Sequence, residues 1–377
     1  MADANDIVEE FERAGFGRNQ EFAAVRPLRL LHLPNEEVEG FQVGPREAFE
    51  ALSREGSLAA YEAYSFLIEA ARLGITVALE KLVEQARRFR PDVVIWQHVS
   101  RFPVDAAFLR YMNAECGNPF VVYHEGDVFG RWIKPLPASV KAFAACADLI
   151  SLVGLGPLAD LFSRHGARRI VLSPHSFDSR RFGQPWQPTR DRRWDVVMIG
   201  NRVQSRIPFK RMPGSKERVD LADELFRRLG GRFAVYGCNW GNRPYAQGPL
   251  PFDRQVDCVR SSWVTVSWDH FHDVPYYFSD RLPIALAAGV PHVTNRQPGY
   301  ETFFRDAAGL VHAPGVIGVA DAVSALLSRP RRELLDLGEQ AKLFAYERLS
   351  ARRVYADLIT VVAEQMRGCN RGQDRCA

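Results

Sequence analysis

The sequence lacks the features that mark membrane-spanning, disulfide-bonded and zinc-binding proteins. Its 6 cysteines are scattered over 377 residues with no C-x-x-C pair, which argues against a paired metal site and indicates thiols in a reducing compartment. No apolar run approaches the roughly 18 residues that a membrane span needs. The acidic start Met1–Asp6 has no apolar signal-peptide core. We therefore expect a cytoplasmic protein.

A strong excess of charge is also missing. The 49 Lys and Arg residues against 45 Asp and Glu residues leave a formal net charge of +4, which gives no strong preference for nucleic acid or membrane. The composition, 46% hydrophobic and 25% charged, is that of a globular protein. A chain of this length can bury a large core, and its length predicts two domains.

Apolar strands alternate with helices through the chain, which predicts α/β domains with parallel sheets. We expect strands at 28–33, 92–96, 119–123, 148–153, 194–200, 232–236, 263–267, 290–294 and 309–312. We expect helices at 6–16, 45–54, 57–74, 75–89, 105–115, 216–229, 282–288, 318–327, 332–346 and 351–366. The linker Ser173–Phe182 places the domain boundary near residue 183.

One glycine motif has to be weighed as a dinucleotide fingerprint. Gly154–Ala159 reads G-x-G-x-x-A directly after a predicted strand. It lies in mid-chain rather than after a first strand, and no acidic residue ends the strand that follows. We therefore reject a dinucleotide site here.

The stretch Pro275–Phe304 carries the most specific pattern in the chain. A loop ending at Ser279 leads into a short apolar helix with Pro283 in its first turn and Gly289 after its end. Helix dipole and unpaired amides favour an anion near Ser279, and Arg281 adds a positive charge. The alternative is an ordinary buried helix with a solvated arginine.

This stretch, with the strand before it, resembles the second half of nucleotide-sugar glycosyltransferases of GT-B architecture, in which two Rossmann-like domains with parallel sheets face each other across a cleft. The CgeB-like and group 1 glycosyltransferases resemble it most. The matching residues are Ser279, Arg281, Ala287, Gly289, Pro291, Thr294, Gly299, Glu301 and Phe304. The sequence departs from the family at Ile284, where many relatives have a glutamate that holds the donor ribose, and at Tyr276, where retaining relatives often have an acid.

The resemblance implies that the two domains bind different substrates. Residues 1–182 would hold the acceptor, and residues 183–350 would hold the nucleotide-sugar donor, UDP- or GDP-linked. The helix 351–366 would cross back to the first domain, ahead of a flexible tail at 367–377. The sequence shows no cofactor and no metal-ligand spacing, so we expect transfer without a metal.

Positive side chains follow the first strand of the second domain. The strand ends at Gly200, and relatives carry basic residues just after this glycine, which makes Arg202, Arg206 and Lys210 candidates for the diphosphate. Fixed Arg or Lys would stabilise the charge that the leaving group gains. A solvated basic loop is one alternative, and a nucleic-acid patch is another.

The nucleoside pocket is expected beside the next strand of this domain. Asn239 and Trp240 lie in a turn that resembles the family's Y-G-x-x-W pattern, and Gly248 follows them. The resemblance implies that these three residues line the pocket.

Catalytic groups are expected at strand ends of the first domain. His124 and Asp127 follow the strand 119–123, and His98 follows the strand 92–96. These side chains could supply a general base or orient sugar hydroxyls. For His98, an ordinary hydrogen-bonded histidine is an equal alternative.

The resemblance implies transfer of a sugar to an acceptor that the sequence leaves unidentified. A noncatalytic nucleotide-sugar-binding protein and a sugar-nucleotide epimerase share the architecture and stay open. A small molecule, peptide or glycan is the expected acceptor. A hydroxylated base in DNA is the alternative, because arginines gather at positions 190, 192, 193, 202, 206 and 211. The oligomeric state cannot be read from the sequence.

Overall fold

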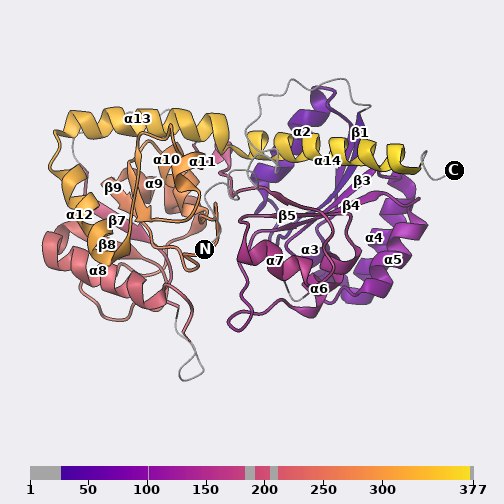
Figure 1. Ribbon diagram of the computed structural model, residues 1–377, viewed down its shortest axis with the longest axis horizontal. Coiled ribbons are helices and arrows are strands. Elements are labelled where there is room, and N and C mark those ends of the chain that lie inside the picture. The colour runs from indigo at the N-terminus through magenta and orange to yellow at the C-terminus, as the bar shows by residue number, and fades with distance from the viewer. Residues whose placement is uncertain (1–26, 101, 183–191, 204–210, 374–377) are drawn as a thin grey trace. The chain divides into compact units, whose positions relative to one another are not determined.

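A computed structural model describes residues 27–100, 102–182, 192–203 and 211–373 (Figure 1). The chain divides into two compact units, the first formed by Met1–Pro174 with Ala351–Ala377 and the second by His175–Ser350. The division after Pro174 precedes the boundary expected near residue 183, which lies outside the described residues. The helix expected at 6–16 also lies outside them.

The first unit is built on a parallel sheet of six strands in the order β2-β1-β3-β4-β5-β6. The strands are β1 (Leu28–Leu33), β2 (Leu58–Ala63), β3 (Val93–Gln97), β4 (Phe120–Glu125), β5 (Leu149–Leu152) and β6 (Ile170–Leu172). The helices are α2 (Val43–Arg54), α3 (Phe66–Leu73), α4 (Ile75–Phe89), α5 (Ala106–Glu115), α6 (Ala138–Cys146), α7 (Pro157–Ser163) and α14 (Ala351–Gln373). α14 extends beyond the end expected at Met366.

Each face of this sheet buries a separate set of side chains. On one face, apolar residues of β1, β3 and β4 pack with α2 and α14, which lie side by side (Figure 1). On the other, Trp96 packs against Phe143 of α6, and Tyr123 stacks on Phe143 with ring centroids 4.5 Å apart. Because side chains alternate along a strand, Tyr123 and Glu125 share this second face, whereas His124 shares the first.

The single helix expected at 57–74 is wrong. Leu58–Ala63 forms β2, which pairs in parallel with β1, and the helix α3 begins only at Phe66. The segment LAAYEA consists mostly of good helix formers. Pairing with β1 at the edge of the sheet outweighs that local preference, as tertiary context often does.

The second unit contains a parallel sheet of five strands in the order β11-β10-β9-β7-β8. The strands are β7 (Trp194–Ile199), β8 (Phe233–Tyr236), β9 (Ser262–Val266), β10 (His292–Asn295) and β11 (Leu310–Ala313). The helices are α8 (Ser215–Leu229), α9 (Gln255–Arg260), α10 (Arg281–Ala287), α11 (Tyr300–Phe303), α12 (Gly315–Leu327) and α13 (Arg331–Arg348). Short 3-10 turns lie at Ser179–Phe182, Gly230–Arg232 and Phe252–Arg254.

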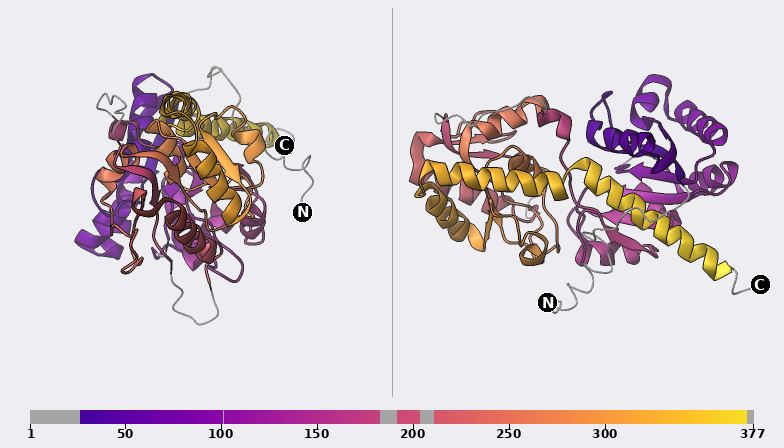
Figure 2. Two further views of the ribbon diagram at one scale, coloured as in Figure 1. Left: turned by 90° about the vertical axis from the view of Figure 1, so that its left-hand side faces the viewer. Right: turned by 90° about the horizontal axis from the view of Figure 1, so that it is seen from above.

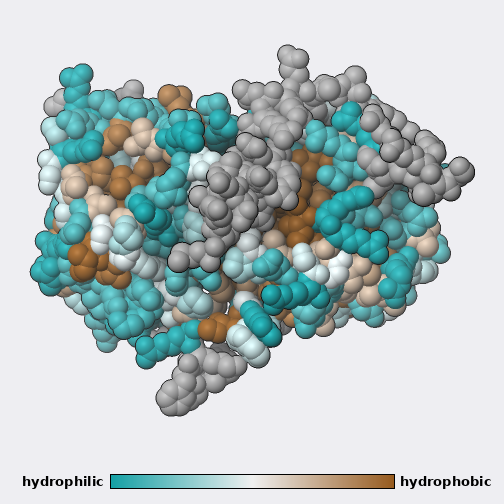
Figure 3. Space-filling model, viewed as in Figure 1, coloured by the Kyte–Doolittle hydropathy of each residue, from teal (hydrophilic) through white to brown (hydrophobic). Residues whose placement is uncertain are grey.

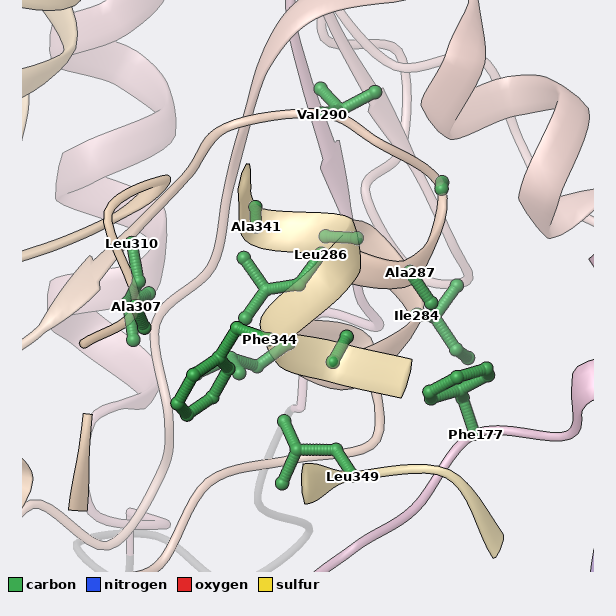
Figure 4. Close-up of a cluster of buried hydrophobic side chains, with 14 of the residues drawn as sticks. Phe177, Ile284, Leu286, Ala287, Val290, Ala307, Leu310, Ala341, Phe344 and Leu349 are labelled. Atoms are coloured by element: carbon green, nitrogen blue, oxygen red, sulfur yellow. The ribbon is translucent and has the colours of Figure 1, made fainter. Parts of the chain in front are cut away.

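α10 lies inside an apolar cluster of the second unit. Figure 4 shows part of this cluster, with Leu286 of α10, Phe344 of α13 and Leu349 just after α13. All apolar side chains of α10 are buried, as the sequence predicts for so short a helix. The helix ends in a Schellman arrangement, because Gly289 has a φ of 74° and the Val290 amide donates to the Ala285 carbonyl.

Hydrophilic side chains cover most of the face seen in Figure 3, with smaller apolar areas between them. Within the described ranges, the structure has no helix that combines the length and the hydropathy needed to cross a membrane. Figure 2 shows α13 and α14 as two successive long helices, the first in the second unit and the second in the first unit.

Candidate functional site

The strand order locates the candidate binding edge in the second unit. Counted along the chain, β7 and β8 are the first and second strands, and chain order reverses between β7 and its other neighbour β9. Open parallel sheets bind ligands beyond the carboxyl ends of the strands at such a reversal. The residues at this point are Gly200 and Asn201 after β7, and Ser267 to Asp269 after β9.

Close backbone packing surrounds Gly200. A Cβ atom at Gly237 would overlap the Gly200 carbonyl, so the turn after β8 lies directly against the end of β7. The Trp240 indole N–H donates to the Gly200 oxygen at 2.7 Å, and the Gly237 amide donates to the Gly248 oxygen at 2.8 Å. The structure therefore brings Gly200, Trp240 and Gly248 together.

Two arginines converge on Gly200. A Cβ atom there would lie 3.6 Å from Nη1 of Arg218 on α8 and 3.7 Å from Nε of Arg281 on α10. Arg218 is 5% exposed, and it donates to the carbonyl oxygens of Trp268 and Asn201. Burial, with the charge of Arg281 nearby, lowers the pKa of Arg218 to about 10. Two guanidinium groups held this close favour a bound anion.

Buried polar atoms lie next to the arginine pair. Asp269 and Ser279 are buried, and among the described residues Nε of Arg281 is a buried polar atom without a hydrogen-bond partner. Burial raises the pKa of Asp269, although a hydrogen bond from Ser279 and the charges of Arg218 and Arg281 act against this rise. An unpaired buried polar atom is costly, so this cluster of buried polar side chains is a candidate ligand site.

A cavity of about 470 Å³ opens at the carboxyl ends of β9 and β10. Its size lies within the range of roughly 300–1,000 Å³ that is usual for small-molecule sites. The polar and aromatic lining residues are Glu217, Trp268, His272, Asn295, Arg296, Gln297 and Glu301. α12 begins at the cavity, with Gly315 in its wall, so the positive end of its dipole faces this region.

In the first unit, a buried carboxylate orients a histidine at the strand ends. Glu125 is fully buried and accepts hydrogen bonds from the Tyr123 hydroxyl at 2.6 Å and from the Asp127 amide at 2.8 Å. Nδ1 of His98 also contacts Glu125, and Nε2 of His98 lies 3.9 Å from Oδ2 of Asp127. His98 has a φ of 38°, an uncommon backbone conformation for a residue with a side chain.

The environment of His98 favours its protonated form. Burial by itself lowers the pKa of His98, but the hydrogen bond and charge of Glu125, with the charge of Asp127, raise it above the ordinary value. The side chain is still 21% exposed. A histidine held at Nδ1 by a carboxylate and open to solvent at its other edge is suited to exchange protons with a substrate.

The three candidate catalytic residues differ in their surroundings. His98 and Asp127 lie together at the strand ends, and Nζ of Lys134 binds Asp127 at 2.6 Å. His124 is 6% exposed on the opposite face of the sheet, where Nδ1 lies 3.0 Å from the Ser151 hydroxyl and the ring packs against Tyr355 of α14. Direct contact of His124 with a substrate is therefore the weakest of these predictions.

The predicted donor residues are also spread unevenly. Gly200, Ser279 and Arg281 gather at the arginine pair, and the Arg202 amide donates to the Cys238 carbonyl beside them. Asn239 is exposed, with a φ of 68°. Trp240 is 2% exposed in the apolar core, so it acts on a ligand only through Gly200. Arg206 and Lys210 lie outside the described residues.

Sequence reasoning missed Arg218 and did not select Glu125. Arg218 lies on a helix whose charged residues look solvated in the sequence, and only its neighbours Leu221, Ala222 and Leu225 mark that face as buried. The burial of Glu125 could have been predicted from the sequence, because strand alternation puts this residue on the same face as Trp96 and Tyr123.

Residues 217–360 match a family model described as glycosyl transferase-like. The matched range runs from α8 into α14 and includes both arginines of the pair. Solved structures share the arrangement over nearly the whole chain. Anabaena HepE in complex with UDP and glucose is 12% identical, with a TM-score of 0.56, covering 89% of this chain and 100% of its own. This protein has the GT-B fold.

Other solved GT-B neighbours give the same result. A glycosyltransferase from Rickettsia africae is 13% identical, with a TM-score of 0.57, covering 89% of this chain and 98% of its own. Sucrose-phosphate synthase from Thermosynechococcus elongatus is 12% identical, with a TM-score of 0.53, covering 92% of this chain and 99% of its own. No curated protein sequence matches the chain. The resemblance to GT-B glycosyltransferases is confirmed, whereas the CgeB-like subgroup stays a prediction.

Proposed function

We propose that the protein transfers a sugar from a nucleoside-diphosphate sugar to a hydroxylated acceptor without a metal ion. The glycosyl transferase-like match supports glycosyl transfer in general. The observation that carries the finer proposal is the pair Arg218 and Arg281, whose guanidinium atoms lie within contact distance of a Cβ position at Gly200.

The arginine pair suits a diphosphate leaving group. When the bond from the sugar carbon C1 to the diphosphate oxygen breaks, its electron pair stays with the diphosphate, which gains negative charge. Preorganised cations stabilise this charge most where water is excluded. Arg218 is already held by backbone carbonyls, so its guanidinium needs little reorganisation when the anion arrives.

The donor would extend along the strand ends on both sides of the pair. Gly248, which the turn after β8 holds beside Gly237, leaves room for a nucleoside, because a Cβ atom there would meet no other atom within 4 Å. The cavity lined by Trp268, Asn295 and Gln297 would take the sugar, since its polar side chains suit hydroxyl groups. The structure of Anabaena HepE, which shares the fold, contains UDP and glucose.

The His98–Glu125 pair would activate the acceptor. Nε2 of His98 takes the proton of the acceptor hydroxyl as its oxygen forms the new bond to C1, and Glu125 stabilises the resulting imidazolium through Nδ1. Glu125 is a positioning residue in this scheme, because it acts through His98. The proton ends on His98, and the electron pair of the broken bond ends on the diphosphate.

A noncatalytic nucleotide-sugar-binding protein is the second candidate. Ile284 occupies the position of the family's ribose-binding glutamate, and it packs in the apolar cluster around α10. The family's usual ribose contact is therefore absent at this position. A donor site that departs from the family in this way is the observation that favours a protein without turnover.

One experiment separates the candidates. The full-length protein is incubated with UDP-, GDP- and dTDP-linked sugars, with and without EDTA, and free nucleoside diphosphate is measured. Release that survives EDTA supports metal-free transfer, and an epimerised sugar nucleotide without release indicates an epimerase. Binding of UDP by calorimetry without release or epimerisation would leave a binding protein.

A further inference from the structure

Trp132 is the most exposed large apolar side chain in the described part of the chain, at 75%. It lies in a short turn after β4, between Gly130 and Lys134. An isolated exposed aromatic residue needs no explanation by itself. Trp132 stands out because contacts fix its turn and link the turn to the His98–Glu125 pair.

The turn is fixed at its base. The Gly130 amide donates to the Lys134 carbonyl at 3.2 Å, and Lys134 adopts a φ of 56°, which is uncommon for a residue with a side chain. The Lys134 ammonium lies 4.9 Å from the centroid of the buried Phe129 ring. The backbone that carries Trp132 is therefore fixed by the contacts of Gly130 and Lys134.

The same lysine connects the turn to the His98–Glu125 pair. Lys134 binds Oδ2 of Asp127 at 2.6 Å, and this oxygen lies 3.9 Å from Nε2 of His98. Trp132 is only two residues from Lys134, and two residues of extended chain span at most about 7 Å. Lys134 therefore joins the turn that carries Trp132 to the carboxylate beside His98.

The charges around Trp132 narrow the class of ligand. Asp127 neutralises Lys134, and the Arg131 guanidinium lies 4.9 Å from the Trp132 ring centroid, so the turn is no polyanion patch. Arg131 lies over one face of the indole, and because the side chain is 75% exposed, the other face can take a single flat ring. Trp is suited to such contacts, because it joins a broad apolar face to a polar edge.

We propose that the acceptor is a saccharide of at least two units, whose reacting unit lies at His98 while the next ring stacks on Trp132. This inference rests on the proposed function, since it assumes that His98 receives the acceptor hydroxyl. It adds the chemical class of the acceptor and the residue that selects for its length.

Calorimetry with defined probes tests this inference. Cellobiose, maltose, lactose and chitobiose, and their monosaccharides, are titrated into the full-length protein saturated with UDP. At least one disaccharide binds, and Trp132→Ala weakens its binding about tenfold or more, the loss typical of removing an aromatic stacking partner. Trp132→Phe retains most of the affinity, and monosaccharide binding is unchanged in both variants.

Tyr111→Ala is the matched control, because Tyr111 is a 50% exposed aromatic on α5 of the same unit. Equal disaccharide binding by wild type and Trp132→Ala overturns the inference. Binding to phosphatidylglycerol vesicles that is lost in Trp132→Ala, with no saccharide binding, assigns the turn to a membrane surface and overturns it too.

The two proposals fail separately. If UDP binds and no disaccharide does, the proposal of a saccharide acceptor is wrong, whereas the proposal of a donor site is still supported. If UDP does not bind while a disaccharide binds through Trp132, the proposed transfer falls and a saccharide-binding surface remains.

Discussion

Arg281 is the residue whose removal tests the donor site most directly. Arg281→Ala removes one of two cations beside Gly200 without disturbing the backbone bonds of Arg218. UDP binding should weaken by about 1.5–3 kcal/mol, the usual contribution of a charge-assisted hydrogen bond. Titration calorimetry measures the loss. Arg227→Ala, which removes a 68% exposed arginine of α8, should leave the affinity unchanged. Equal UDP affinity in Arg281→Ala and wild type would exclude Arg281 from the site.

Glu125→Gln tests the histidine pair through its pH dependence. A general base works when deprotonated, so kcat/KM should rise with pH through the raised pKa of His98. Without the Glu125 charge that pKa falls, so the acid limb of the profile should move to lower pH. The plateau should drop by about 10²-fold or more, because the imidazolium loses its partner. Glu62→Gln, at a partly exposed carboxylate of the same unit, is the control. An unshifted acid limb would remove Glu125 from the mechanism.

The sequence predicted that His98 and Asp127 follow neighbouring strands, and the structure places the two side chains near each other. This follows because the carboxyl ends of parallel strands lie at one edge of the sheet. The alternation of β4 could also have separated His124 from Glu125, since adjacent residues face opposite sides. Arg218 could not be found this way, because its role depends on carbonyl groups of Asn201 and Trp268 that are distant in sequence.

At the scale of elements, the crossing of α13 over α10 is set by glycine. Gly338 lies inside α13, and a Cβ atom there would overlap the Gly289 carbonyl at the end of α10. Gly338→Ala gains helix propensity of at most about 1 kcal/mol. Overpacking costs about 1–3 kcal/mol, so we expect a net loss in the free energy of unfolding.

Urea denaturation measures this loss. Gly231→Ala is the matched control, because no atom lies within 4 Å of its Cβ position. The control should change the free energy of unfolding by no more than about 0.5 kcal/mol. Equal stability of the two variants would mean that α13 shifts away from α10 without cost.

The element that sequence reasoning misassigned shows what local pattern leaves out. Leu58–Ala63 has helix-forming residues and no strict alternation, so only its pairing with β1 makes it a strand. α10 was placed correctly within one residue, because Pro283 and Gly289 mark its ends by backbone chemistry. Local sequence signals therefore predicted a helix whose ends are marked by Pro and Gly. They missed a strand that forms only because it pairs with β1.

At the scale of the whole molecule, the two parallel sheets followed from apolar strands alternating with helices. Strands such as Val93–Gln97 and Ser262–Val266 are buried along their whole length, which is the mark of a sheet covered on both faces. The strand order was beyond sequence reasoning, because it depends on which helices return to which side. The arginine pair and the His98–Glu125 pair lie at the carboxyl edges of their sheets, where open parallel sheets usually bind ligands.

The distribution of charge over the whole molecule leads us to expect no binding to duplex DNA. The net charge is +4, and two of the six arginines counted for a basic patch pack against tryptophan rings. Arg192 is 6% exposed, donates to the Ser262 carbonyl and lies over the Trp263 ring, and Arg193 lies over Trp194. Arg190 and Arg206 lie outside the described residues.

Fluorescence anisotropy with a labelled duplex of random sequence tests this expectation. A phosphate-binding protein shows affinity that falls steeply with salt, because each neutralised phosphate releases counterions. We expect no increase in anisotropy at about 50 mM salt, a concentration at which such contacts are strong. UDP binding by the same sample is the control for folded protein. Tight binding at low salt that weakens by orders of magnitude toward about 200 mM would instead support a nucleic-acid acceptor. That result would contradict the proposal that the acceptor is a saccharide that stacks on Trp132.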